Sequence, residues 1–141
     1  MIEQGTDEWF QLRTGNITAS RISDVVARIK TGWGASRQTY KKALIAERLT
    51  NIPTKMYTSQ AMQWGNDTED DAALYYEFMT DYQVETVGYV QHPLIERAGA
   101  SPDRLVNDVG LVEIKCPNTE THAETLRTQT IPKRYKLQMQ W

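Results

Sequence analysis

The stretch Ser101-Pro102-Asp103, followed after nine residues by Glu113-Ile114-Lys115, decides the fold. We predict short strands over residues 97–101 and 111–115, and a hairpin strand that ends at Asp103. Alternate side chains of a strand share a face, so Glu113 and Lys115 should point the same way while Ile114 packs behind them. The hairpin would then bring the Asp103 carboxylate beside Glu113.

Two carboxylates with a nearby lysine suit phosphodiester hydrolysis. Hard carboxylate oxygens and water are the ligands that Mg²⁺ prefers, and Mn²⁺ is the expected substitute. The metal activates water and offsets phosphate charge, while Lys115 orients the nucleophile and stabilises developing charge. An exposed strand face with an acid-x-lysine pair is the alternative interpretation, which the upstream Pro102-Asp103 makes less favourable.

The chain length of 141 residues fits one domain, here one nuclease domain over 1–141. The first half, 1–80, reads as helical: apolar residues recur at helical spacing over 22–29, and helices are predicted over 37–49 and 59–80. Residues 84–117 form the predicted hairpin and catalytic core, beginning with a strand over 84–91. Helices are predicted within 119–141, over 120–127 and from Pro132 onward.

Glu69 lies on an apolar stripe of the predicted helix 59–80. Met62, Gly65, Ala72 and Tyr76 share its stripe at steps of three and four residues. A carboxylate among such neighbours needs a polar or charged partner.

Composition excludes several classes of protein. Hydrophobic residues make up 40% and charged residues 24%, typical of a globular chain, and no apolar run is long enough to span a membrane. The start lacks a secretory signal and Cys116 is the single cysteine, so we expect a cytoplasmic protein without disulfides or an iron–sulfur cluster. His92 and His122 are unsupported as a zinc site, and no Walker-type phosphate loop is present.

Charge is unevenly distributed about the formal net charge of −2. Residues 25–66 carry a local balance of +6, which suits phosphates, and residues 67–85 carry acids without any lysine or arginine, which suits cations or solvation. Two solvated helix faces explain the same pattern. The basic residues of the first segment are Arg28, Lys30, Arg37, Lys41, Lys42, Arg48 and Lys55.

The whole chain resembles the PD-(D/E)XK nucleases, and more closely the lambda exonuclease and YqaJ-like viral recombinase family. Four blocks carry the resemblance in order. They are Leu12-Arg13-Thr14-Gly15-Asn16-Ile17-Thr18-Ala19-Ser20, Trp64-Gly65 with Glu69, Ser101-Pro102-Asp103, and Glu113-Ile114-Lys115-Cys116-Pro117. The resemblance implies an α/β fold of the restriction-endonuclease type, a small mixed sheet flanked by helices.

The resemblance also implies roles for single residues. Asp103, Glu113 and the backbone carbonyl of Ile114 would bind the metal, and Lys115 would be the catalytic lysine. Glu69 would be the helix-borne acid near the metal. Gln138 would be the active-site glutamine of the last helix, with a surface polar residue as the alternative.

Arg13 and Ser20 resemble a pocket for the 5′-terminal phosphate of DNA. An arginine fork matches phosphate oxygens, and a serine in the first turn of a helix adds a hydroxyl beside free backbone donors. Read without the resemblance, Ser20 is a helix cap and Arg13 a surface charge. Trp9 is expected in the core.

Two features depart from the family pattern. Arg104 stands where the family commonly has glycine after Ser-Pro-Asp, and is expected to strain the turn or to contact phosphate. Relatives continue beyond the helix containing Gln138, so an incomplete sheet with an exposed edge is expected for this chain.

The function that we predict is a Mg²⁺-dependent exonuclease of phage recombination. The resemblance implies that it degrades the 5′-ended strand of linear double-stranded DNA. By resemblance, a homo-oligomeric ring and a single-strand annealing protein are expected partners. One alternative is a catalytically inactive, truncated prophage remnant that still binds DNA ends. The other is an endonuclease built on the same core.

Overall fold

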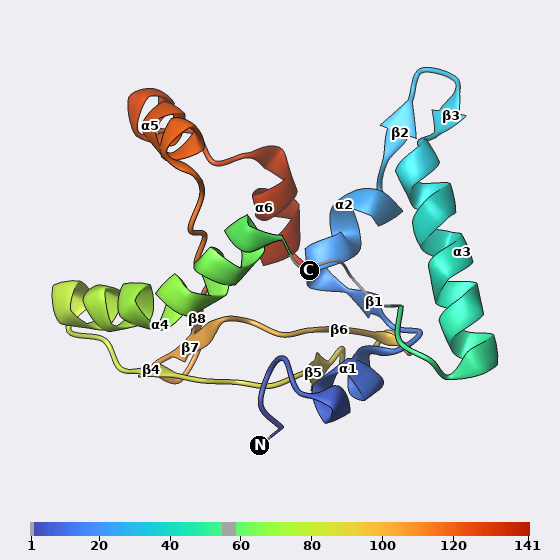
Figure 1. The fold of residues 1–141 in the computed structure, drawn as a ribbon, viewed down its shortest axis with the longest axis horizontal. Coiled ribbons are helices and arrows are strands. Elements are labelled where there is room, and N and C mark those ends of the chain that lie inside the picture. Colours follow the sequence, from blue (N-terminus) through green and yellow to red (C-terminus); the bar gives the residue numbers. More distant parts are fainter. Residues whose placement is uncertain (1, 55–58) are drawn as a thin grey trace. The chain divides into compact units, whose positions relative to one another are not determined.

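The computed structural model describes residues 2–54 and 59–141. These residues form two compact units, which are described one at a time (Figure 1). The first unit contains residues 2–54, 87–101 and 132–141, and the second contains residues 59–86 and 102–131.

The first unit is built on a mixed three-stranded sheet of order β1-β6-β5, in which β1 is parallel and β5 antiparallel to β6. A separate hairpin pairs β2 with β3. The strands are β1 (Ile17–Thr18), β2 (Arg28–Ile29), β3 (Gly32–Trp33), β5 (Val90–Gln91) and β6 (Ala98–Ala100). The helices are α1 (Asp7–Arg13), the 3₁₀ turn η1 (Ala19–Arg21), α2 (Ile22–Val25), α3 (Ala35–Thr50) and α6 (Lys133–Met139).

Buried side chains from several elements form the core of the first unit. Trp9 of α1, Ile22 of α2, Tyr40 of α3 and Ala98 of β6 are all below a tenth exposed. The prediction that Trp9 packs in the core is therefore confirmed. Its indole nitrogen also donates a hydrogen bond of 3.0 Å to the Ser101 hydroxyl, which keeps the indole N–H satisfied inside the unit.

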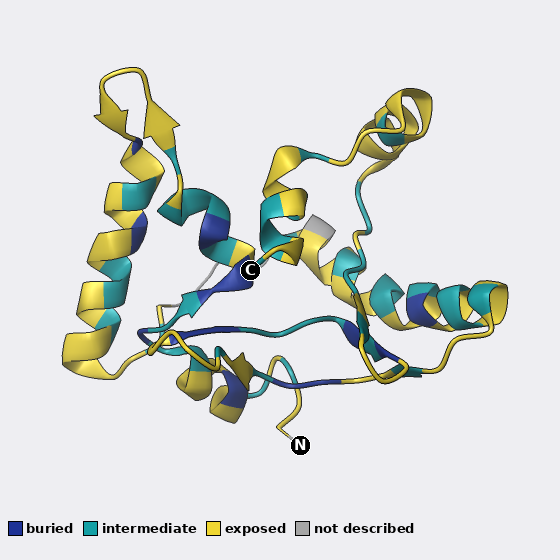
Figure 2. Cartoon of the chain, turned by 180° about the vertical axis from the view of Figure 1, so that it is seen from behind, coloured by how far each residue is buried: buried dark blue, intermediate teal, exposed yellow. Residues whose placement is uncertain are grey.

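The second unit pairs an antiparallel sheet of order β4-β7-β8 with the long helix α4. Its elements are α4 (Gln60–Thr80), β4 (Val84–Glu85), β7 (Arg104–Val106), β8 (Gly110–Val112) and α5 (Thr119–Thr128). Ser59 caps α4 by accepting from the Met62 amide, and Asn118 caps α5 by accepting from the Thr121 amide. Ala73 of α4 and Val106 of β7 are buried, whereas α5 has no buried residue (Figure 2).

Several predicted boundaries were wrong. The strand expected over 111–115 ends at Val112, so Glu113 and Lys115 follow the strand rather than sharing its face. Asp103 does not end a hairpin strand, because it directly precedes β7. The strand predicted over 84–91 is divided into β4 and β5, and the helix predicted over 22–29 stops at Val25. The half 1–80, which was predicted to be helical, also contains the strands β1, β2 and β3.

The last helix, α6, ends at Met139. Among the described residues, no helix combines the length and the apolar character needed to cross a membrane.

Candidate active site

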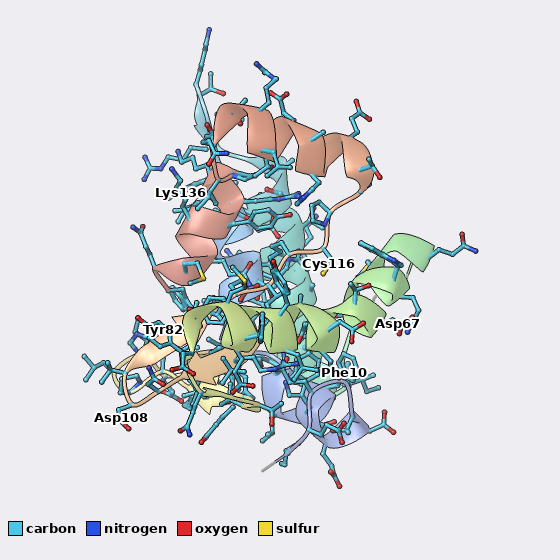
Figure 3. The ribbon with its side chains drawn as sticks, turned by 90° about the vertical axis from the view of Figure 1, so that its left-hand side faces the viewer. Phe10, Asp67, Tyr82, Asp108, Cys116 and Lys136 are labelled. Atoms are coloured by element: carbon cyan, nitrogen blue, oxygen red, sulfur yellow. The ribbon has the colours of Figure 1, made fainter. Side chains whose placement is uncertain are left out.

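The two halves of the motif meet in the second unit. The turn at Asn107-Asp108 folds β8 back along β7, with Arg104 opposite Val112. This pairing places Ile114 beside Asp103, and the Ile114 amide donates a hydrogen bond of 2.5 Å to Oδ2 of Asp103. In Figure 3, Asp108 marks the turn and Cys116 marks the segment that leaves the motif toward α5.

Glu113 and Lys115 form an ion pair between the Lys115 ammonium and Oε1 of Glu113. The Glu113 side chain is only 9% exposed, whereas that of Lys115 is 36% exposed. The predicted association of acid and lysine is thus present, although an irregular segment rather than a strand face creates it.

The surroundings of Asp103 disfavour the ionised form of its carboxyl group. Burial, the negative charge of Glu113 and, more weakly, that of Glu69 raise the pKa of Asp103 from 3.8 to about 6. The Ile114 hydrogen bond and the positive charge of Lys115 lower that pKa in opposition. Two carboxylates that lie close together and half-buried disfavour each other's ionisation. A cation bound between them would favour the ionised form of both.

The donor set fits a hard divalent cation. Asp103 and Glu113 offer carboxylate oxygens and Ile114 offers a backbone carbonyl, which are the ligand types that Mg²⁺ and Mn²⁺ bind. Within residues 2–54 and 59–141, no three His, Cys, Asp or Glu side chains gather closely enough to enclose a metal ion by themselves. Water and a substrate phosphate would therefore supply the remaining ligands, as is usual for Mg²⁺.

Glu69 has the charged partner that its apolar stripe predicts. Its Oε1 lies 2.8 Å from Nη1 of Arg104, which also binds Asp70 through Nη2. Arg104 is not among the residues with positive φ, and its side chain is buried against these acids. The expectation that Arg104 strains the turn was wrong, because this residue begins a regular strand.

Arg13 and Ser20 lie together in the first unit, as the phosphate-pocket prediction requires. The guanidinium carbon of Arg13 lies 3.9 Å from the centre of the Trp9 ring, and Nη2 lies 3.4 Å from the Ser20 hydroxyl. Burial lowers the pKa of Arg13, while Tyr40, Tyr89 and Glu47 raise it. A guanidinium and a hydroxyl placed side by side can both offer donors to an oxyanion.

The turn between these two residues depends on Gly15, which has φ of +71°. Its amide donates to Oε2 of Glu47 at 2.7 Å, and its carbonyl accepts from Nε of Arg48 at 2.7 Å. A Cβ at this position would lie 2.7 Å from Cγ of Arg48. Glycine is required here both by the backbone conformation and by the close approach of α3.

Tyr89 is a neighbour of Arg13 that the sequence did not reveal. Its buried hydroxyl makes no well-formed hydrogen bond within the described part of the chain, although the Asn16 side chain lies close enough to lower its pKa against the effect of burial. Tyr89 directly precedes β5, and a tyrosine beside a strand carries no local signal of such a place, since strands are rich in tyrosine.

Gln138 lies on α6, a helix of the first unit that packs against η1 and α2. Cys116 is partly exposed, and burial raises the pKa of its thiol. A raised pKa leaves less of the thiol in its nucleophilic thiolate form.

Comparison with solved structures identifies the fold. The alkaline exonuclease of Laribacter hongkongensis matches with a TM-score of 0.86 and 47% sequence identity, over 96% of this chain and 66% of that one. The same exonuclease in complex with dAMP matches with a TM-score of 0.87, again at 47% identity and with the same coverage. No curated protein matches the sequence. The predicted restriction-endonuclease type of fold, with small sheets flanked by helices, is confirmed.

The sequence also matches the YqaJ-like viral recombinase domain over residues 8–141. The chain belongs to this family, which confirms the resemblance carried by the four sequence blocks. It spans slightly less than two thirds of the length of the Laribacter exonuclease.

Proposed function

We propose that residues 1–141 form one nuclease domain that hydrolyses DNA from its 5′ end with the help of Mg²⁺. The observation that carries the proposal is the meeting of Asp103, Glu113 and Lys115 around the Ile114 amide. Family membership and the match to an exonuclease of 47% identity support the same reaction.

Each residue of this cluster has a distinct task. Asp103, Glu113 and the carbonyl of Ile114 would hold the cation, and the Ile114 amide keeps the Asp103 carboxylate turned toward the motif. When bound, the cation lowers the pKa of a water molecule and offsets charge on the phosphate. Lys115 orients that water and faces the developing negative charge, because Glu113 holds its ammonium at the site.

The chemical step is a hydrolysis that needs no further reactant. The water oxygen forms a bond to phosphorus as the bond from phosphorus to the 3′ oxygen breaks. The leaving 3′ oxygen takes up a proton, and water loses one. A deoxynucleoside 5′-monophosphate is released from a 5′-phosphorylated end, and the complex of the Laribacter exonuclease with dAMP is consistent with such a product.

Strand polarity is proposed from the pocket of the first unit. Arg13 and Ser20 would bind the 5′-terminal phosphate, since both offer donors to an oxyanion and the Trp9 ring supports the guanidinium. Gln138 is proposed as a further active-site residue. Linear duplex DNA is the proposed substrate, and a single-strand annealing protein is the partner that would use the exposed strand.

The experiment that tests the proposal is incubation with linear, 5′-phosphorylated duplex DNA in Mg²⁺, in Mn²⁺ and in EDTA. We expect release of mononucleotides in either metal and none in EDTA. End-labelling of each strand separately determines polarity, and release of the 3′ label first would contradict the proposed direction.

The two alternatives give different results in the same assay. Cleavage of closed circular DNA, which offers no end, would identify an endonuclease. Binding of DNA ends without cleavage in any metal would identify an inactive end-binding remnant.

A further inference from the structure

Arg104 is a buried cation beside the proposed metal site. It is the first residue of β7, and its side chain is only 9% exposed. Burying a guanidinium is costly unless charged or polar partners satisfy it, so its contacts identify what it does.

A single nitrogen of Arg104 contacts both the Glu69 side chain and the Asp103 main chain. Nη1 lies 2.8 Å from Oε1 of Glu69 on α4 and 2.6 Å from the main-chain oxygen of Asp103. Because both acceptors bind one nitrogen, the Glu69 carboxylate is held at a fixed place relative to the Asp103 backbone.

The second nitrogen, Nη2, binds Oδ1 of Asp70. Asp70 is 86% exposed, whereas Glu69 is 30% exposed. The two ion pairs therefore differ in environment: that of Asp70 is open to solvent and of little energetic weight, and that of Glu69 is better shielded from solvent.

We infer that Arg104 is a positioning residue, which holds Glu69 at the proposed metal site through its shared contact with the Asp103 carbonyl. The inference rests on the proposed function and adds a residue to it. Without the guanidinium, Glu69 would lose the contact that fixes its distance from Asp103. A lysine could bind one acceptor but lacks the planar fork that serves Glu69, Asp103 and Asp70 together.

The test is a double-mutant cycle on two readouts. Arg104→Gln, Glu69→Gln and the double variant are compared with wild type for single-turnover cleavage and for Mn²⁺ affinity measured by electron paramagnetic resonance. We expect each single variant to lose roughly ten- to a hundred-fold in both, as for residues that orient metal ligands. The double variant should lose no more than either single variant.

Two further variants separate positioning from general support of the fold. Asp70→Asn is the matched control, because it removes the exposed ion pair of the same guanidinium, and it should behave as wild type. Arg104→Lys should retain part of the Mn²⁺ affinity and decides the matter if Arg104→Gln does not fold. Free guanidinium at millimolar concentration should partly restore Arg104→Gln, whereas urea should not.

The outcomes separate this inference from the proposed function. If wild type binds Mn²⁺ and the Arg104 variants bind it equally well or more tightly, the inference is overturned and the metal site stands. Additive losses in the double variant would overturn it as well. A wild-type chain that neither cleaves DNA nor binds Mn²⁺ overturns both.

Discussion

The Ile114 amide donates to the Asp103 carboxylate at 2.5 Å, across a separation of 11 residues. This contact joins the two halves of the motif independently of any metal. The backbone donor fixes one carboxylate oxygen, so Asp103 would need little rearrangement to bind the proposed cation.

Replacing a proposed metal carboxylate should abolish cleavage without unfolding the chain. Glu113→Gln keeps side-chain volume, and Asp103→Asn keeps an acceptor for the Ile114 amide, so neither creates a cavity. We expect cleavage at background level, and we expect the variants to lack the rise in Tm that Mg²⁺ should give to wild type. Undiminished cleavage by either variant would disprove the assignment.

Lys115→Ala should reduce the single-turnover rate by about 10²- to 10⁴-fold, the range for a positioned proton-transfer or charge-stabilising group. DNA affinity should change little, because one lysine contributes little to a contact spread over many phosphates. Affinity measured in Ca²⁺ provides the comparison. A fall in affinity at an unchanged rate would make Lys115 a phosphate contact only.

Asp103 should make the metal-free protein less stable at alkaline pH. Its pKa is about 6 in the folded chain and lower when unfolded, so the folded state binds more protons between these values. Stability contributed by this group is therefore lost as pH rises from about 4 to above 6. In EDTA at pH 8, Asp103→Asn should have a higher Tm than wild type, and the difference should shrink toward pH 4.

The control for this pH effect is Asp108→Asn. Asp108 is exposed in the β7–β8 turn, so its replacement should leave the pH dependence of Tm as in wild type. If Tm depends on pH in the same way in Asp103→Asn and in wild type, the raised pKa of Asp103 is contradicted.

Arg13 should confer a preference for phosphorylated 5′ ends. A hydrogen bond to a charged group contributes about 1.5–3 kcal/mol, so wild type should favour 5′-phosphate over 5′-hydroxyl ends by roughly ten- to a hundred-fold. Arg13→Ala should remove this preference. Arg127→Ala, which removes the same charge from an exposed pair with Glu124 on α5, should retain it. Equal discrimination by all three proteins would exclude the pocket.

Gly15→Ala should destabilise the chain by about 1–2 kcal/mol, because an L-residue in the left-handed region pays this amount before any contact with Arg48 is counted. Urea denaturation followed by circular dichroism measures the change. Gly5→Ala, at φ of +84° with open space around its Cβ, is the matched control for the backbone contribution alone. If Gly15→Ala lowers the free energy of unfolding no more than Gly5→Ala does, α3 must shift to accommodate the added methyl group.

Local signals predicted the long helices well, and the short helix α2 and the strands less well. Ser59 and Thr80 bound the predicted helix 59–80 almost as found, because caps and helical periodicity are encoded within a few residues. The strands here are two or three residues long, and such lengths carry almost no periodic pattern. β7 was missed for this reason, and Asp103 was assigned to the wrong end of a strand.

The candidate site was predicted from the order of its residues along the chain. The contacts that surround those residues were not predicted. Asp103, Glu113 and Lys115 follow from a motif. Arg104 could not be foreseen as the partner of Glu69, because the contact joins residues 35 apart through a side chain that composition alone would place on the surface. The shared contact exists only once β7 and α4 are folded.

Within the part of the chain that the structure describes, three helices end at a residue in the left-handed conformation that is not glycine: Asn51 after α3, Asp81 after α4 and Gln129 after α5. Glycine is usual there because other residues incur a steric penalty, least for asparagine and aspartate. Gln129→Gly should therefore relieve the most strain. All three positions lie at helix ends rather than among the proposed catalytic residues, so they offer a route to a sturdier background in which damaging active-site variants can still be purified and compared.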